Sequence, residues 1–180
     1  EFRRSPTAPS VLRRHVAFSR QLLVSDLHDD ESLAVLERRV DEWLSAMKAE
    51  NSAILAIDRA EPDPAFRSRW YVRMQGETKD FTTIWITLGQ RTLRYETYVM
   101  PAPEENLTEF FDNLLRRNER LVGAHFSIGA EDAVFLRGDI PLRALNEREL
   151  DRIVGSVYAY VEQCFRPLLA IGFASRFRSD

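Results

Sequence analysis

The stretch EFFDNLLRRNERLVGAHFSI, residues 109–128, decides the fold because its apolar residues change their spacing halfway along it. Its first half has apolar residues at helical spacing, which predicts an amphipathic helix with a core stripe of Leu107, Phe110, Phe111, Leu114 and Leu115. Its second half alternates, which predicts a strand over 121–128. Ala124, Phe126 and Ile128 would share one side of that strand, and His125 and Ser127 the other.

Charged residues separate the two halves. Arg116, Arg117 and Arg120 fall at the predicted end of the helix, where cations meet the negative end of the helix dipole. Glu104 and Glu105 would lie in its first turn, where acids are favoured. This arrangement has two interpretations, a working site or ordinary helix electrostatics, and the sequence leaves both open.

The segments upstream change from helical to strand periodicity. A helix is predicted over about 31–49, begun by Asp29 or Asp30 as its N-terminal cap. Alternation and β-branched residues then predict strands at 53–59, 69–75, 80–88 and 92–100. Short connections between these strands are typical of hairpins, and therefore of antiparallel pairing.

The downstream segments complete the domain. AVFLRG, residues 133–138, predicts a second strand of a hairpin, and Arg137-Gly138-Asp139 is interpreted as a turn at its end. Asn146 and Glu149 form a capping-box pattern before a long last helix, which Pro167 should kink or interrupt. The order α-β-β-β(-β)-α-β-β-α predicts an α+β fold with an antiparallel sheet of about five to six strands and three main helices.

Charge is distributed unevenly along the chain of 180 residues. Residues 1–25 contain five arginines and one acid, a charge of +4, so the remaining residues carry −3 − 4 = −7. We therefore divide the chain into a basic N-terminal extension, residues 1–26, and a single domain, residues 27–180. The extension has proline-rich and basic amphipathic parts, which indicates partial disorder or a helix. We favour an extension that packs loosely on the domain or stays mobile over one that binds a partner or a membrane surface, and we expect no membrane partner for the protein.

Most catalytic chemistries lack their sequence signatures. Seven scattered glycines form neither a phosphate loop nor a nucleophile elbow, and the three histidines form no zinc motif. The single cysteine, Cys164, lies on the core stripe of the last helix and is expected to be a buried thiol in a reducing, cytoplasmic setting. No apolar run approaches the length of a membrane span. We expect no enzymatic activity, no metal and no cofactor.

Basic and aromatic residues interleave in RSRWYVR, residues 67–73. Single-stranded nucleic acid can bind such a strip through stacking and phosphate contacts. A strand with one wet face produces the same pattern. We favour the strand and expect no nucleic-acid partner.

Several stretches together resemble a known family. TLRYETYVM, FFDNLLRRNERLVGAHFSI, AVFLRGDIPL, NERELDRIVGSV and FRPLLAIGF are similar to the YbjN-like family, whose members are described as bacterial sensory transduction regulators. The resemblance covers roughly residues 31–175. It implies a fold similar to type III secretion chaperones, which are small α+β domains that commonly dimerise and grip extended client segments. It implies no catalytic residues.

Two functions follow as hypotheses. The first is a non-enzymatic protein-binding, chaperone-like or regulatory module, whose second sheet face, around Trp85, is covered by a client segment or by a second copy in a homodimer. The alternative is a sensor domain that binds a small anionic ligand through an arginine cluster. The candidate residues for a partner or ligand are Arg94, Arg116, Arg117, Arg120, His125 and Trp85.

Overall fold

The computed structural model describes residues 28–177, so the basic extension of residues 1–26 lies outside the described part. Three α-helices occur there, α2 (Asp30–Glu50), α3 (Leu107–Asn118) and α4 (Glu147–Gly172). The strands are β1 (Ile54–Arg59), β2 (Ser68–Gln75), β3 (Phe81–Leu88), β4 (Thr92–Met100), β5 (His125–Ile128) and β6 (Val134–Pro141). They form one six-stranded antiparallel sheet in the order β1-β2-β3-β4-β6-β5, which confirms the predicted α+β fold and element order.

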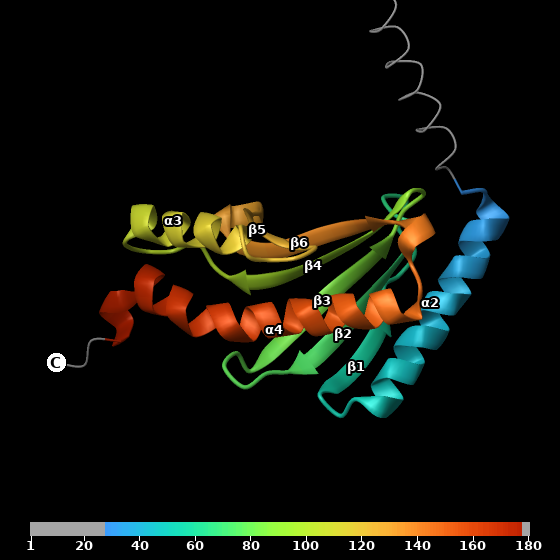
Figure 1. Ribbon diagram of the computed structural model, residues 1–180, viewed down its shortest axis with the longest axis horizontal. Coiled ribbons are helices and arrows are strands. Elements are labelled where there is room, and N and C mark those ends of the chain that lie inside the picture. The colour runs from blue at the N-terminus through green and yellow to red at the C-terminus, as the bar shows by residue number, and fades with distance from the viewer. Residues whose placement is uncertain (1–27, 178–180) are drawn as a thin grey trace, which may run out of the picture.

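All three helices pack against the same face of the sheet (Figure 1). Alternate strand residues point to this face and are fully buried, among them Trp70, Ile84, Ile86, Leu93 and Tyr95. They form one apolar core with the buried stripes of the helices. The molecule is therefore a two-layer structure, and the opposite sheet face has no described helix over it.

Helix α2 is fixed to the sheet by polar contacts as well as by its apolar stripe. The Asp29 side chain caps the helix by accepting from the Ser32 amide at 2.8 Å, as predicted. About three turns further along the helix, Asp41 accepts from the indole Nε1 of Trp70 at 2.6 Å. Glu37 accepts from the Ser68 hydroxyl at 2.6 Å. These bonds satisfy polar groups that the helix–sheet contact would otherwise bury without partners.

The end of the sheet beside α3 depends on Asn118, the last residue of that helix. Its side-chain oxygen accepts from the Phe126 amide at 2.6 Å, and its side-chain NH2 donates to the Phe126 carbonyl at 3.2 Å. Phe126 lies on β5, the edge strand. Asn118 thus gives the edge backbone the two hydrogen bonds that a further strand would have given.

Several predicted boundaries are wrong. Strand β5 begins at His125 rather than at Leu121. The Tyr95 hydroxyl donates a hydrogen bond to the Gly123 carbonyl, and Gly123 adopts a positive φ of 76°, so the chain before His125 does not follow the strand. Helix α3 begins at Leu107, and the backbone amides of Glu104 and Glu105 bind the Gly172 carbonyl instead of opening the helix.

Burial and strand length also differ from prediction. Leu107 and Leu115 are exposed, so the core stripe of α3 is narrower than its sequence indicates. Ile128, at the end of β5, is exposed as well. Arg137-Gly138-Asp139 lies inside β6 rather than in a turn, paired with residues of β4. Helix α4 continues through Pro167 to Gly172, so the proline does not interrupt it.

Candidate functional site

The helix-free sheet face, called here the open face, carries a row of aromatic side chains from four strands. Tyr71 packs edge-on against Trp85 at 6.2 Å between ring centroids, and Trp85 against Phe135 at 6.3 Å. Phe135 in turn contacts Tyr98 at 5.7 Å. Tyr98 remains 39% exposed and Phe81, beside the row, 41%. Aromatic rings that stay exposed on a sheet face are typical of surfaces that bind another molecule.

Arginine side chains lie over two rings of this row, Trp85 and Phe135, and over two further rings, Phe66 and Phe81. The Arg69 guanidinium is 4.2 Å from the Phe66 ring centroid and 6.0 Å from that of Trp85. Arg73 lies 4.4 Å from the Phe81 ring and Arg137 4.6 Å from that of Phe135. Arg137 also forms an ion pair with Glu96 at 2.7 Å. Within residues 28–177, Arg69 and Arg73 form no ion pair with a carboxylate.

One end of the open face forms a shallow polar hollow. Arg94 and His125 line it with Arg137 and Asp139, from the paired strands β4, β5 and β6. His125 is exposed and lies opposite Arg137. The hollow is continuous in register with the aromatic row, because Trp85, Glu96, Arg137 and His125 follow one another across the sheet.

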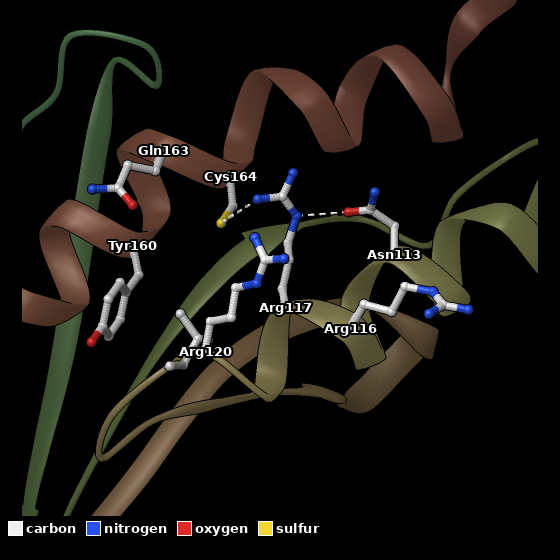
Figure 2. A pocket seen from close by; sticks show the side chains of 8 residues that line it. Asn113, Arg116, Arg117, Arg120, Tyr160, Gln163 and Cys164 are labelled. Carbon is white, nitrogen blue, oxygen red and sulfur yellow. Dashed lines mark hydrogen bonds between the residues drawn. The ribbon is translucent and has the colours of Figure 1, made fainter.

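A separate pocket lies on the other side of the sheet, between α3 and α4. Its volume is about 380 Å³, and it is lined by Asn113, Arg116, Arg117, Arg120, Leu121, Tyr160, Gln163 and Cys164. Figure 2 shows the guanidinium groups of Arg117 and Arg120 directed toward α4, whereas Arg116 points away from it. The Arg116 guanidinium donates to the Asp112 carboxylate at 2.7 Å. This ion pair raises the pKa of Arg116 and balances its charge. None of the lining residues is acidic.

Arg117 crosses the floor of this pocket, called here the α3–α4 pocket. Its Nε donates to the Asn113 side-chain oxygen at 2.6 Å and its Nη1 to the Cys164 sulfur at 3.4 Å (Figure 2). Cys164 is buried, as predicted, and burial raises the pKa of its thiol although the nearby Arg117 opposes that rise. The sulfur is therefore a neutral partner and does not balance the arginine charge.

The six residues predicted from sequence are thus placed in two regions. Trp85, Arg94 and His125 lie on the open face, and Arg116, Arg117 and Arg120 lie beside the α3–α4 pocket. Sequence reasoning missed Tyr71, Tyr98 and Phe135 as members of one row, and Tyr160 and Gln163 as pocket walls. Strand alternation gives the side of each strand, but only the register between strands places the rings together.

Metal chemistry finds no support in the described residues. Across 28–177, no group of three or more histidine, cysteine or acidic side chains is close enough to hold a metal ion. Likewise, none of the helices of this part combines the length and hydropathy needed to span a membrane.

The family assignment rests on residues 38–170, which match the model of the YbjN family, described as "Putative bacterial sensory transduction regulator". The chain belongs to the YbjN family. The match includes every strand, α3 and most of α2 and α4, so it covers both the open face and the α3–α4 pocket. It confirms the resemblance seen in the sequence.

The chain is also similar to individual proteins of mycobacteria. It is 32% identical over 109 residues to an uncharacterized protein of Mycobacterium tuberculosis, a match that covers 61% of this chain and 60% of the relative. It is 30% identical over 112 residues to an uncharacterized protein of Mycobacterium leprae, over 62% of this chain and 61% of the relative. The chain therefore spans about three fifths of the curated relatives it matches.

The fold also occurs among solved structures. A crystal structure of an uncharacterized protein from Methanothermobacter thermautotrophicus aligns with a TM-score of 0.55 at 16% identity. The alignment covers 79% of this chain and 99% of the archaeal one. At this identity the similarity concerns the arrangement of helices and strands alone.

Proposed function

We propose that this YbjN-family protein is a non-enzymatic, regulatory binding module whose open face receives an extended acidic segment of a partner protein. The observation that carries the proposal is the aromatic row on a sheet face that no described helix covers. Arg69 and Arg73 lie over rings in and beside this row and have no carboxylate partner within residues 28–177. A face exposed only to water would be expected to alternate cleanly to small polar residues.

Charge complementarity favours an acidic partner. Five cationic side chains lie on or at the rim of the open face: Arg69, Arg73, Lys79, Arg94 and Arg137. Asp58, Glu96 and Asp139 are the acids that the strand register places there. Arg69 and Arg73 sit over rings without a carboxylate partner in the described part of the chain, so an incoming carboxylate would meet a preformed fork.

The family description, "Putative bacterial sensory transduction regulator", supports the regulatory part of the proposal. The absence of an enzymatic activity is part of what we propose. We place binding within one domain, residues 27–180, in the cytoplasm. The basic extension, residues 1–26, would then be an independent addition to that domain.

The test is a selection of random peptides against the full chain, followed by binding measurements on the selected sequences. We expect enrichment of peptides that combine Asp or Glu with apolar residues, and binding that weakens as salt is raised. The double variant Arg69→Gln/Arg73→Gln should lose about tenfold or more in affinity, because each lost charge-assisted hydrogen bond contributes about 1.5–3 kcal/mol. The matched control, Arg38→Gln/Arg39→Gln, removes the same charge from the exposed side of α2 and should bind normally.

Other occupants of the open face have distinct outcomes. Sedimentation that shows a dimer, dissociated by Trp85→Ala, would assign the face to a second copy and contradict the acidic-segment proposal. Enrichment of basic or uncharged peptides would contradict it as well. Single-stranded nucleic acid that binds more tightly than any peptide, and is lost in the Arg69→Gln/Arg73→Gln variant, would also overturn it.

A further inference from the structure

The α3–α4 pocket contains two arginines whose charges no described residue balances. Arg117 uses two of its five N–H donors, both on neutral partners, Asn113 and the Cys164 thiol. The Arg120 side chain forms no hydrogen bond or ion pair with any residue in the range 28–177. Arg117 is half-buried, and a guanidinium withdrawn from water without a counter-ion carries a free-energy cost.

The backbone holds the two arginines on one side of the helix end. Helix α3 ends at Asn118, and the Arg120 amide then donates to the Arg117 carbonyl at 2.9 Å, which continues the turn. Residues three apart in such a turn lie on the same side. Asn118, bound to β5 through both atoms of its amide, prevents this segment from moving away.

Helix α4 supplies the opposite wall. The Tyr160 hydroxyl accepts from the Val122 amide at 3.2 Å, which fixes the ring beside the pocket and joins the turn after α3 to α4. The exposed Gln163 amide has no hydrogen bond to a described residue, so it can rotate to donate into the pocket. A volume of about 380 Å³ lies in the range of small-molecule sites.

We infer that the α3–α4 pocket binds a phosphate group, free or as the terminal group of a small metabolite, between the guanidinium groups of Arg117 and Arg120. Two planar forks without a competing carboxylate match the oxygens of a dianion in geometry and in charge. The site lies behind the sheet from the open face, so it adds a ligand-sensing function to the peptide-binding one. It also narrows the arginine cluster suggested by sequence to two members.

A simpler explanation exists for the same residues. Arginines in the last turn of a helix are stabilised by its carbonyl ends, without any ligand. That explanation predicts no response to phosphate beyond the response to ionic strength. The two explanations therefore differ in whether the protein responds to phosphate when the ionic strength is held constant.

The test titrates the full chain with inorganic phosphate, sulfate and phenyl phosphate at constant ionic strength, and follows the arginine Nε–H signals by 1H–15N NMR. We expect the Arg117 and Arg120 signals to shift with saturation. Tighter binding of phenyl phosphate than of inorganic phosphate identifies an ester as the ligand, and the reverse identifies free phosphate. Both results support the inference.

Variants locate the binding. Arg120→Gln removes an exposed side chain that has no polar partner among residues 28–177, so the fold should survive, and affinity should fall about tenfold or more. Arg117→Gln should have a similar effect, and Arg39→Gln on α2 is the charge-matched control. No saturable shift, undiminished binding in Arg120→Gln, or binding of a phosphopeptide but of none of the three small probes would overturn the inference. None of these results depends on the open face, so they are separate from the test of the proposed function.

Discussion

Asn118 illustrates how one residue supports both regions of the protein. Its amide bonds to Phe126 secure the sheet edge, and its position at the end of α3 sets where Arg117 and Arg120 lie. The residues next to it in the sequence are charged, but it is the neutral Asn118 that connects α3 to β5. A helix-to-strand junction and a binding pocket are therefore built from the same short segment.

Replacing this residue should weaken the fold. We expect Asn118→Ala to lower the free energy of unfolding by about 1–3 kcal/mol, because two backbone groups of Phe126 lose their partner. Urea denaturation followed by circular dichroism measures the change. Glu119→Ala, one residue further along and exposed, is the control and should stay within about 0.5 kcal/mol. Equal stability of Asn118→Ala and the control would contradict this role of the edge bonds.

Lys79 makes the free energy of unfolding depend on pH. Burial lowers its pKa from 10.5 to about 8, and the charge of Glu162 opposes that change. Its Nζ donates to the Tyr98 carbonyl at 2.5 Å. The unfolded chain therefore holds this proton more tightly than the folded one, and the folded state should gain stability as the pH rises from about 8 toward 10.5.

Lys79→Met tests this linkage. The difference in unfolding free energy between the wild type and the variant should move in favour of the wild type between about pH 7 and pH 9.5. Denaturant titrations at both pH values measure it, and the comparison cancels most of the tyrosine ionisation that both proteins share. A difference that is constant with pH would show that Lys79 keeps an ordinary pKa in the folded protein, and one that moves toward the variant would show that its pKa is raised. Either result would contradict the prediction.

At the scale of elements, the close approach of the turn after α3 to β6 depends on Gly138. A Cβ at this position would lie 2.2 Å from the Gly123 carbonyl oxygen and 2.5 Å from the Tyr95 ring. The Gly123 carbonyl accepts the Tyr95 hydroxyl, and burial raises the pKa of that phenol. Strand β6, strand β4 and the turn before β5 therefore meet at a point where only a glycine fits.

Two glycine-to-alanine substitutions distinguish the effect of this close contact from the general preference of regular secondary structure for alanine over glycine. Gly138→Ala should destabilise the protein by about 1–3 kcal/mol, the usual cost of overpacking, because backbone would have to move. Gly155→Ala, on α4 with nothing within 4 Å of the added Cβ, should instead stabilise it by up to about 1 kcal/mol. Thermal unfolding of the two variants measures both signs. Stabilisation by Gly138→Ala would contradict the close approach.

Sequence periodicity predicted the elements well where one face of each element is buried. The helix predicted over about 31–49 and the strand predicted over 69–75 both form. Leu33, Val40, Leu44 and Met47 are the buried stripe of α2, and buried residues alternate around Trp70 in β2. The prediction was wrong where a tertiary contact overrides the local pattern. Leu115 has helical spacing but lies 70% exposed, and the chain from Leu121 to Ala124 stays out of the strand because Tyr95 holds Gly123.

The candidate sites were less predictable for a physical reason. Arg117 and Arg120 could be noted from the sequence, but Tyr160 and Gln163 lie about forty residues further along and reach the pocket only through helix packing. The aromatic row likewise depends on the register that sets Tyr71 opposite Trp85 and Tyr98 opposite Phe135. Local sequence patterns specify neither how closely α4 approaches α3 nor which residues of neighbouring strands lie opposite each other.

At the scale of the whole molecule, the two layers separate the two proposed sites. The three helices pack against one face of the sheet, and no described helix lies over the open face (Figure 1). The α3–α4 pocket lies where two of these helices meet, whereas the open face carries the aromatic row and the arginines over it. A ligand on one side and a protein segment on the other would be connected through β4, β6 and the Asn118 junction. Both molecules could then be bound at once under the two proposals.

The three tryptophans report on the three parts of this arrangement. Trp43 lies on α2, Trp70 is buried in the core with its indole bound to Asp41, and Trp85 lies in the aromatic row of the open face. Their indole N–H signals, assigned by single Trp→Phe variants, can be followed in one 1H–15N NMR titration with an acidic peptide selected against the full chain. We predict that the Trp85 signal shifts with saturation while those of Trp43 and Trp70 stay in place. A shift confined to Trp43 or Trp70, or no shift in any of the three, would contradict binding at the open face.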